Sequence, residues 1–318
     1  MSNVLRIACL ITAASCFAAD ALAQEKVRVF ILAGQSNMQG LGQADWGRDY
    51  LGDDVDGNPT FGASYIGGPG SLRYFAETAD PAKYGKLLDT NGDWIVRDDV
   101  WVWSRNGQDL PGIDDDSDKN NDTVTGNLTT GFGAVPNSGN SQIGPEFGFG
   151  QAVGDAFDDQ VAIVKIAWGG KSLAYDFRPP TAQETRPIDW ANFGNNGLDP
   201  DGAGLYYDLT VSNIQDALVD LAAQFPDKEI ELTGFGWHQG FNDRLTEPFR
   251  LEYEENMTDF INDMREDLDA EDLPFVIATT GMNPLFKEQR NLQLHVEQTN
   301  LADPELHPEF EGNVAVVD

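Results

Sequence analysis

The residues that could do chemistry begin with a serine at position 36, directly after an apolar run. Val27 to Ala33 is apolar and β-branched, Gly34 ends the run, and Ser36 follows within Gly-Gln-Ser-Asn-Met. This pattern is typical of a buried strand that ends in a sharp turn. A serine there exposes its hydroxyl at the carboxyl end of a strand, which is the edge where open α/β sheets bind ligands. Ser36 is therefore a candidate nucleophile, and the alternative is a serine that caps the next helix.

A serine nucleophile needs a base and also donors for the developing oxyanion, and two later strand ends offer donors. The strand predicted at 161–167 runs into Gly169-Gly170, where the backbone can approach a substrate and present a bare N–H. The strand predicted at 230–235 is followed by the side-chain amides of Gln239 and Asn242, which can each donate N–H. We expect the oxyanion hole to combine the N–H of Ser36, that of Gly169 or Gly170, and the amide of Gln239 or Asn242.

The elements that must position these residues alternate between strands and helices. Amphipathic spacing predicts helices at 205–225 and 249–268. Apolar runs predict strands at Val27–Ala33, Val100–Ser104, Val161–Ala167, Ile230–Phe235, Phe275–Thr280 and Asn313–Val317. Alternation of this kind indicates parallel βαβ units, and we predict one three-layer α/β/α sandwich. Long irregular insertions at about 43–99, 114–143 and 171–204 are expected to form the walls of a cleft.

In this order, the three strand ends resemble the SGNH hydrolase superfamily, and in finer detail its sialate O-acetylesterase and carbohydrate esterase family 6 branch. The residues that carry the resemblance are Gly34 to Met38, Gly144-Pro145-Glu146, Gly169 or Gly170, Trp237 to Gly240, and Gly240-Phe241-Asn242-Asp243. The resemblance spans residues 27–243. It implies a flavodoxin-like parallel sheet and a secreted serine esterase, with Ser36 as nucleophile, that removes acetyl groups from carbohydrates. No metal or cofactor is required by such an enzyme.

The catalytic histidine of that family lies in a loop after the last core strand, and the sequence departs from the pattern here. We predict that last strand at 313–317, and the sequence ends at Asp318. We therefore expect the catalytic His/Asp pair after Asp318, and part of the C-terminal region to be missing. Of the three histidines present, His238 is expected in the cleft wall, His295 on the surface of a helix, and His307 at the wrong end of the last strand.

Several further side chains are candidates for the cleft or for substrate contact. Glu146 either stabilises a helix start through the helix dipole or orients the cleft near Ser36 by a hydrogen bond. Lys171 and Arg178 follow the Gly-Gly turn and either contact substrate or are simply solvated. The complete set of possible cleft residues is Gln35, Glu146, Lys171, Arg178, Trp237 and His238.

Composition excludes several classes of partner. Residues 1–23 resemble a secretory signal peptide cut after Ala23, which predicts a secreted or periplasmic domain over 24–318. Both cysteines lie in that segment, so the mature chain is expected to have no disulfide and no cysteine metal site. A net charge of −33 repels nucleic acid and anionic membranes, and no other apolar run is of membrane-spanning length.

Two other functions compete with the esterase. The first is a non-catalytic carbohydrate-binding protein on an esterase scaffold, or an inactive truncated fragment, with tryptophans that stack on sugars: Trp46, Trp101, Trp103, Trp168, Trp190 and Trp237. The second is a calcium-dependent surface protein that uses the acidic run at 114–122, which we interpret as a solvated loop because an EF-hand pattern is absent. The acetylated sugar stays open, and a neutral polysaccharide such as xylan suits the acidic chain at least as well as sialic acid.

Overall fold

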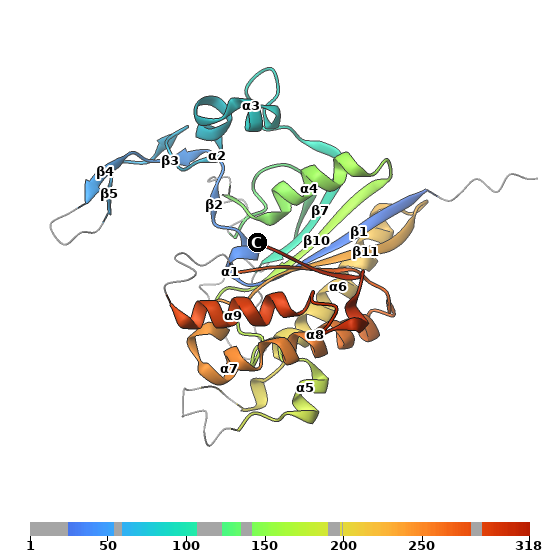
Figure 1. The fold of residues 1–318 in the computed structure, drawn as a ribbon. Helices are drawn as coiled ribbons and strands as arrows, with labels where there is room; N and C mark the ends of the chain where they lie inside the picture. The colour runs from blue at the N-terminus through green and yellow to red at the C-terminus, as the bar shows by residue number, and fades with distance from the viewer. Residues whose placement is uncertain are drawn as a thin grey trace, which may run out of the picture.

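A mostly parallel sheet forms the centre of the molecule (Figure 1). The computed structural model describes residues 25–53, 59–106, 123–134, 142–189, 198, 200–280 and 288–318. Its large sheet has the order β13-β12-β11-β1-β10-β7-β8, and only β8 runs antiparallel to its neighbour. The strands are β1 (Lys26–Gly34), β7 (Arg97–Asn106), β8 (Val124–Leu128), β10 (Gln160–Ala167), β11 (Glu229–His238), β12 (Phe275–Ala278) and β13 (Val314–Val317).

The five strands β10-β1-β11-β12-β13 have the flavodoxin order 2-1-3-4-5, which confirms the predicted fold class. Strands β7 and β8 extend this core beyond β10. In this order, β10 lies on one side of β1, and β11, the next strand of the core, lies on the other side, so the strand order reverses at β1. The crevice that this reversal opens lies at the carboxyl ends of β1 and β11, where ligands bind in open α/β sheets.

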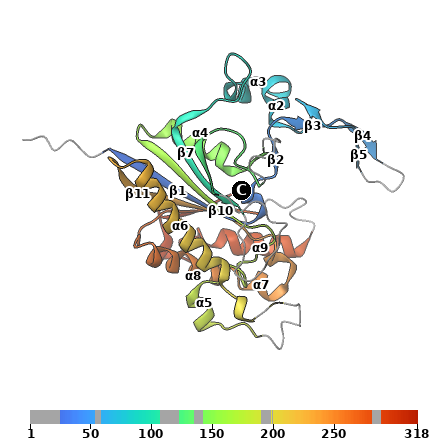
Figure 2. The ribbon, with the colours of Figure 1, turned by 180° about the vertical axis from the view of Figure 1, so that it is seen from behind.

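Helices cover both faces of the sheet, as Figures 1 and 2 show, and give the predicted three layers. Helix α4 (Pro145–Ala156) packs on one face, and α6 (Leu205–Gln224), α8 (Tyr253–Asp267) and α9 (Gln289–Asn300) pack on the other. Alternation along β1 explains this: Val29 and Ile31 face the α6–α8 core, whereas Phe30 and Leu32 face α4. Because β1 is buried on both faces, its sequence is a continuous apolar run.

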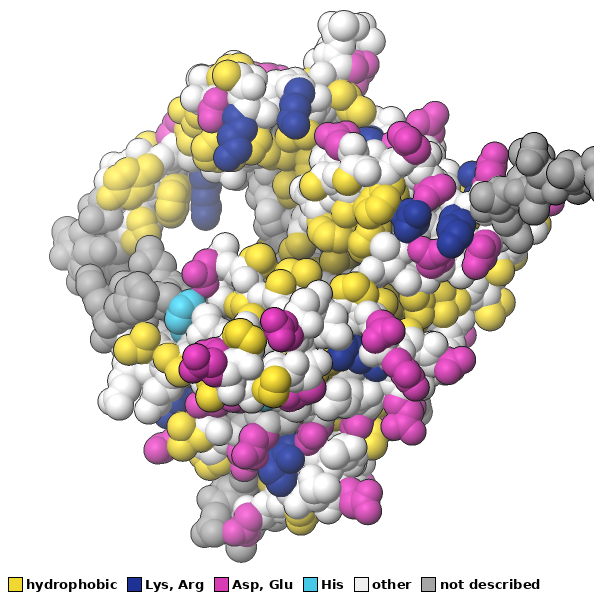
Figure 3. All heavy atoms as spheres, turned by 45° about the vertical axis from the view of Figure 1, so that its right-hand side comes forward, with side chains coloured by type: hydrophobic (Ala, Val, Ile, Leu, Met, Phe, Trp, Pro, Cys, Tyr) yellow, Lys and Arg dark blue, Asp and Glu magenta, His cyan; other side chains and the backbone are white. Residues whose placement is uncertain are grey.

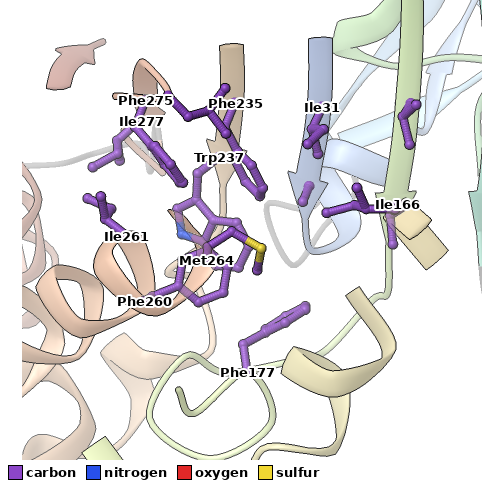
Figure 4. Close-up of a cluster of buried hydrophobic side chains, with 14 of the residues drawn as sticks. Ile31, Ile166, Phe177, Phe235, Trp237, Phe260, Ile261, Met264, Phe275 and Ile277 are labelled. Atoms are coloured by element: carbon purple, nitrogen blue, oxygen red, sulfur yellow. The ribbon is translucent and has the colours of Figure 1, made fainter. Parts of the chain in front are cut away.

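Aromatic side chains fill the core between β11 and the helices α6 and α8 (Figure 4). Phe235 and Phe275 stack with ring centroids 4.5 Å apart, and Trp237 lies 4.5 Å from Phe260. Phe177, from the segment after β10, meets Trp237 edge to face at 5.1 Å. This cluster packs against the carboxyl-terminal half of β11 through Phe235 and Trp237.

Several elements differ from their predicted bounds, among them β11 and the helix predicted at 249–268. Strand β11 continues to His238 rather than ending at Phe235, because Gly234 and Gly236 act as strand residues and not as a turn. A Cβ atom on Gly236 would lie 2.7 Å from Leu32 Cδ2, so glycine makes room for a large side chain of β1. The predicted helix at 249–268 is divided into α7 (Glu247–Leu251) and α8.

The insertions contain short regular elements rather than only irregular chain. Three two-stranded ribbons pair β2 (Gly42–Gln43) with β9 (Gln142–Ile143), β3 (Trp46–Gly47) with β6 (Tyr65–Ile66), and β4 (Tyr50–Asp53) with β5 (Pro59–Phe61). We call residues 43–53 and 59–70 the arm, which projects from the body in Figure 1. The remaining helical segments are α1 (Ser36–Gln39), α2 (Leu72–Tyr74), η1 (Phe75–Ala79), α3 (Pro81–Tyr84), η2 (Gly85–Leu87), α5 (Pro180–Thr185), η3 (Pro200–Gly202), η4 (Asp243–Leu245) and η6 (Pro308–Phe310).

Some predictions concern residues that the structure does not describe. The predicted signal peptide at 1–23, the acidic run at 114–122 and Trp190 lie outside the described ranges. Within those ranges, no helix combines the length and the apolar character needed to cross a bilayer.

Candidate active site

The structure brings the three predicted strand ends to one edge of the sheet. Strand β1 lies between β10 and β11, and its last residue, Gly34, pairs with Ala167 on one side and His238 on the other. The N–H of Gln35 donates to the His238 carbonyl at 3.1 Å, which fixes the turn before α1. Ser36 then begins α1 with a partly exposed side chain. The turn at Gln35-Ser36, called the serine turn below, therefore lies at the edge of the sheet between the ends of β10 and β11.

Gln35 positions the loop after β11 and does not face a ligand, because its side chain is only 2 % exposed. Its Oε1 accepts hydrogen bonds from the N–H groups of Gly240 at 3.2 Å and Asn242 at 3.4 Å. Its Nε2 donates to Asn242 Oδ1 at 3.5 Å. The predicted substrate contact of Gln35 is therefore replaced by an internal role: it ties the serine turn to Asn242.

Asn242 and the glycine turn present donors beside Ser36. Asn242 Nδ2 donates one hydrogen bond to the carbonyl of Gly170, which has a left-handed φ of 72°. The other hydrogen of that amide remains available. The N–H groups of Gly169 and Gly170 have no acceptor among the described residues, and the first N–H groups of a helix, here that of Ser36, have no partner within the helix. Gly169, Gly170 and Asn242, which the sequence analysis named as donors, thus lie at the same edge of the sheet as Ser36.

Gln239 has a different role from the predicted one, because both hydrogens of its amide are engaged inside the protein. Its Nε2 donates to the Lys171 carbonyl at 2.9 Å and to Asp243 Oδ2 at 2.6 Å, and the side chain is 1 % exposed. Asp243 also accepts from the N–H groups of Leu173 and Ala174, both at 2.9 Å. Gln239 and Asp243 together join the loop after β10 to the loop after β11.

Asp243 is fully buried, and the sequence analysis gave it no role of its own. Burial raises the pKa of its carboxyl group to about 7, although the hydrogen bonds from Gln239, Ala174 and Leu173 act in the opposite direction. The signal in the sequence was its place in the Gly-Phe-Asn-Asp motif, directly after Asn242. Its hydrogen bonds with Leu173, Ala174 and Gln239 show that it helps to hold the loops after β10 and β11 together.

A buried ion pair lies beneath α1. Lys165 Nζ donates to the carbonyls of Gln39 at 2.7 Å and Phe132 at 2.6 Å, and to Glu146 Oε2 at 2.7 Å. Glu146 Oε1 accepts from the Gly144 N–H at 2.8 Å, and neither charged side chain is exposed. Burial lowers the pKa of the Lys165 ammonium, whereas the neighbouring Glu146 carboxylate raises it. Glu146 therefore orients the serine turn indirectly, through Lys165 and the last carbonyl of α1.

Two predicted substrate contacts are wrong, because both side chains are buried. Arg178 is 1 % exposed and donates to the carbonyls of Ala174 at 2.8 Å and of Arg186. Trp237 is also 1 % exposed and donates from Nε1 to the Tyr253 hydroxyl at 3.2 Å. Arg178 holds the segment after β10 in shape, and Trp237 supports the end of β11 from below. Neither side chain can reach a ligand in the crevice.

Lys171 remains at the surface of the same segment, but it is not free. Its Nζ lies 3.4 Å from Asp176 Oδ1 and 4.1 Å from the centre of the Tyr206 ring. Burial lowers the pKa of the Lys171 ammonium, but the combined interactions with Tyr206 and Asp176 outweigh it and raise the pKa overall. A contact between Lys171 and substrate therefore requires exchange with Asp176.

In the described part of the chain, none of the three histidines forms a hydrogen bond with the Ser36 hydroxyl. His238 is partly buried, which lowers its pKa, and its ring contacts the backbone of Thr279. His307 lies between Glu254 at 2.9 Å and Glu309 at 3.0 Å. Its contacts place it in a separate acidic surface cluster.

His295 differs from the predicted surface position, because its side chain is only 18 % exposed. Its Nδ1 lies 3.7 Å from Asp318 Oδ1, the same oxygen that accepts a hydrogen bond from Thr279 Oγ1 at 3.0 Å. Asp318 follows β13, so this group also lies at the carboxyl ends of the strands. Among the described residues, no cluster of three or more His, Cys, Asp or Glu side chains could hold a metal ion.

Comparison with known proteins assigns the family. The family described as carbohydrate esterases, sialic acid-specific acetylesterases, matches residues 127–305, which is more than half of the chain. This range includes Glu146, Gly169, Gly170 and Asn242, whereas Ser36 precedes it. No curated protein sequence matches the chain.

Solved structures that match this chain in backbone comparison have low sequence identity to it. A protein from Arabidopsis thaliana has a TM-score of 0.47 and 17 % identity, covering 92 % of this chain and 85 % of its own. A carbohydrate acetylesterase from Xanthomonas citri has a TM-score of 0.44 and 14 % identity, covering 91 % and 49 %. NanS has a TM-score of 0.46 and 15 % identity, covering 93 % and 78 %. On the family match, the chain belongs to the sialic acid-specific acetylesterase family of carbohydrate esterases and is a carboxylic ester hydrolase.

Proposed function

We propose that this chain is a secreted serine esterase that removes O-acetyl groups from carbohydrates, with Ser36 as its nucleophile. The observation that carries the proposal is the position of Ser36. It begins a helix at the crevice of the sheet, between free N–H groups at Gly169-Gly170 and the oriented amide of Asn242. Secretion rests on the apolar segment at residues 7–19 and the small residues before position 24.

The proposed reaction follows from this geometry. Ser36 Oγ attacks the acetyl carbonyl carbon, and its proton passes to a base, a role that the family resemblance gives to a histidine. The carbonyl oxygen gains negative charge and is stabilised by the N–H groups of Ser36 and the glycine turn and by Asn242 Nδ2. The sugar oxygen then leaves with a proton, and water releases acetate from Ser36 by the same route. Every donor is fixed in advance by Gln35, Gly170 or the helix, so little reorganisation is needed.

Hydrolysis of an aryl acetate by the full-length protein tests the role of Ser36. Ser36→Ala is expected to abolish turnover above the rate of the uncatalysed reaction, because the acyl-enzyme cannot form without the Ser36 hydroxyl. Ser212→Ala is a matched control, since Ser212 lies exposed on α6 and its hydroxyl donates to the Leu209 carbonyl of the same helix. If Ser36→Ala retains the native rate, the proposed mechanism is wrong.

A non-catalytic carbohydrate-binding protein is the second candidate. It is favoured by one observation, which is that the Ser36 hydroxyl has no hydrogen-bonded base among the described residues. This candidate predicts that an acetylated oligosaccharide binds to the protein and is recovered with its acetyl groups intact. The esterase predicts release of acetate from the same ligand.

A further inference from the structure

The arm contains a pocket whose lining includes none of the candidate active-site residues described above. Its volume is about 480 Å³, and its lining includes Gln43, Trp46, Arg48, Phe61 and Ser64. Of the tryptophans considered for stacking on sugars, Trp103, Trp168 and Trp237 are buried in the core, whereas Trp46 lines this pocket. A partly exposed indole beside polar side chains is a common setting for the face of a sugar ring.

Arg48 gives the pocket its charge. Its guanidinium lies 4.4 Å from the centre of the Phe61 ring and makes no ion pair with any described residue. This is unusual in a chain with 53 acidic and 20 basic residues, in which most described arginines pair with a carboxylate. Arg48 is exposed, and its ring contact with Phe61 is the only partner of its guanidinium among the described residues.

The two acidic residues nearest in sequence, Asp45 and Asp49, form no ion pair with Arg48 among the described contacts and accept hydrogen bonds from other side chains. Asp45 Oδ1 accepts from Arg73 at 2.6 Å and from Trp94 Nε1 at 2.9 Å. Asp49 Oδ1 accepts from the Tyr65 hydroxyl at 3.0 Å. The face in Figure 3 likewise shows hydrophobic and basic side chains together at the end of the molecule that carries the arm.

The pocket is connected to the candidate active site by a short stretch of chain. Gln43 follows Ser36 by seven positions, so their Cα atoms can be at most about 25 Å apart. The arm projects from the body in Figure 1, and the lining of its pocket contains none of Ser36, Gly169, Gly170 and Asn242, so we treat the two as separate sites. A ligand that uses both must be an oligomer.

We propose that this pocket is an accessory subsite for a hexuronate unit of an acetylated polysaccharide, with the sugar on Trp46 and its carboxylate on Arg48. The guanidinium fork matches a carboxylate in a bidentate fashion, and the ring of Phe61 holds it in place. Gln43 and Ser64 supply donors and acceptors for hydroxyl groups. The inference rests on the proposed function, since it names the polymer on which the esterase would act.

The net charge of −33 opposes an anionic ligand, but salt limits the range of that repulsion. At physiological ionic strength, exposed charges more than about 8 Å apart are largely screened from one another. The groups in the pocket then decide which ligand binds. The binding of a uronate is accordingly expected to strengthen as salt is added to very dilute buffer, until screening weakens the contact with Arg48 itself.

Calorimetric titration with tetragalacturonate tests the subsite, with neutral xylotetraose as the comparison ligand. The protein carries Ser36→Ala, so that binding is measured without turnover. Arg48→Ala is expected to weaken tetragalacturonate binding about tenfold or more, the scale of a lost charge-assisted hydrogen bond. The affinity of Arg48→Lys for tetragalacturonate is expected to lie between that of the protein with Arg48 and that of Arg48→Ala, because an ammonium keeps the charge but lacks the guanidinium fork. Arg290→Ala is the control, since it removes the same charge from an exposed pair with Glu288.

Each outcome decides the proposal. Unchanged affinity in Arg48→Ala, or equal binding of xylotetraose, overturns it. Tighter binding of a sulfated tetrasaccharide overturns the uronate assignment in favour of a sulfated polymer. Aryl-acetate turnover in an Arg48→Ala variant with Ser36 intact is expected to equal the native rate. Failure of the Ser36 mechanism would show in that turnover assay, whereas failure of the subsite would show only in the titrations.

Discussion

Substitutions in the buried ion pair of Lys165 and Glu146, beneath the serine turn, are expected to affect folding stability and catalytic rate differently. Lys165→Met keeps an apolar chain of similar length but removes the donors to Gln39 O, Phe132 O and Glu146 Oε2. The Glu146 carboxylate is then left buried without a partner. Breaking a buried pair in this way typically costs about 3–5 kcal/mol of folding free energy, and we expect a value near the upper end because two carbonyls also lose their donor.

The double variant Lys165→Met with Glu146→Gln removes the uncompensated charge. The glutamine oxygen can still accept from the Gly144 N–H, as Glu146 does at 2.8 Å. The loss then reduces to the two carbonyl hydrogen bonds, which together are worth about 2 kcal/mol. The double variant is therefore expected to be more stable than the single variant, although it has one further substitution.

Catalytic activity, unlike stability, is expected to stay low in the double variant, because both variants lose the hydrogen bond from Lys165 to the Gln39 carbonyl, the last carbonyl of α1. A displaced nucleophile can cost up to about a hundredfold in rate, and we expect kcat/KM for an aryl acetate to fall at least tenfold in both. Urea unfolding measures the stabilities, and turnover is compared where each variant is fully folded. Lys26→Met is the control, since Lys26 pairs with Glu231 at the opposite end of β1. A double variant with native kcat/KM, or a single variant with native stability, would refute the reasoning.

Three other substitutions test individual parts of the site. Asn242→Ala is expected to lower kcat for an aryl acetate by about 10²–10³, the usual loss for one oxyanion donor, and an unchanged kcat would remove Asn242 from the mechanism. Asp243 holds its proton to about pH 7 in the folded protein but releases it near 3.8 when unfolded, so stability should fall as pH rises through this window, by at most about 1.4 kcal/mol per pH unit. Asp243→Asn should flatten that part of the curve in urea unfolding, and an identical slope in both proteins would contradict the raised pKa. Arg178→Ala should destabilise the fold by at least about 2 kcal/mol, because buried carbonyls lose their donor, whereas KM for an aryl acetate should not change; a raised KM would restore Arg178 as a substrate contact.

Much of the fold could be predicted because the central strands are buried on both faces. The runs at 27–33 and 161–167 are almost entirely apolar, short, rich in β-branched residues and soon followed by glycine, which together indicate buried parallel strands. Since the carboxyl ends of parallel strands meet at one edge, the order of Ser36, Gly169 and Asn242 along the chain already placed them together.

Burial of individual polar side chains was harder to predict. Arg178 follows a glycine turn and has the sequence of a surface residue, but carbonyls from its own neighbourhood enclose it. Lys165 interrupts an apolar strand, which is a signal of a buried charge, but its partner Glu146 lies on another element. Pairings of this kind depend on the packing of α4 against β10, which local patterns do not contain.

The glycines of β11 illustrate a second feature that could not be predicted from the sequence. Gly234 and Gly236 have the sequence signature of a strand end, because glycine is common in turns. In the structure the side chains of β1 occupy the space above them, and a Cβ on Gly234 would lie 3.3 Å from Phe30 Cδ1. The sequence cannot distinguish a glycine that turns the chain from one that makes room for a neighbouring strand.

The central claim is that Ser36 becomes acetylated during turnover. Mass spectrometry of the full-length protein, quenched in acid during reaction with an excess of aryl acetate, tests it most directly. We predict one acetyl group on the peptide that contains Ser36, absent from the Ser36→Ala variant and present in Ser212→Ala. Steady turnover with no acetyl group on that peptide, or an acetyl group on another residue that disappears at the rate of turnover, would contradict the account.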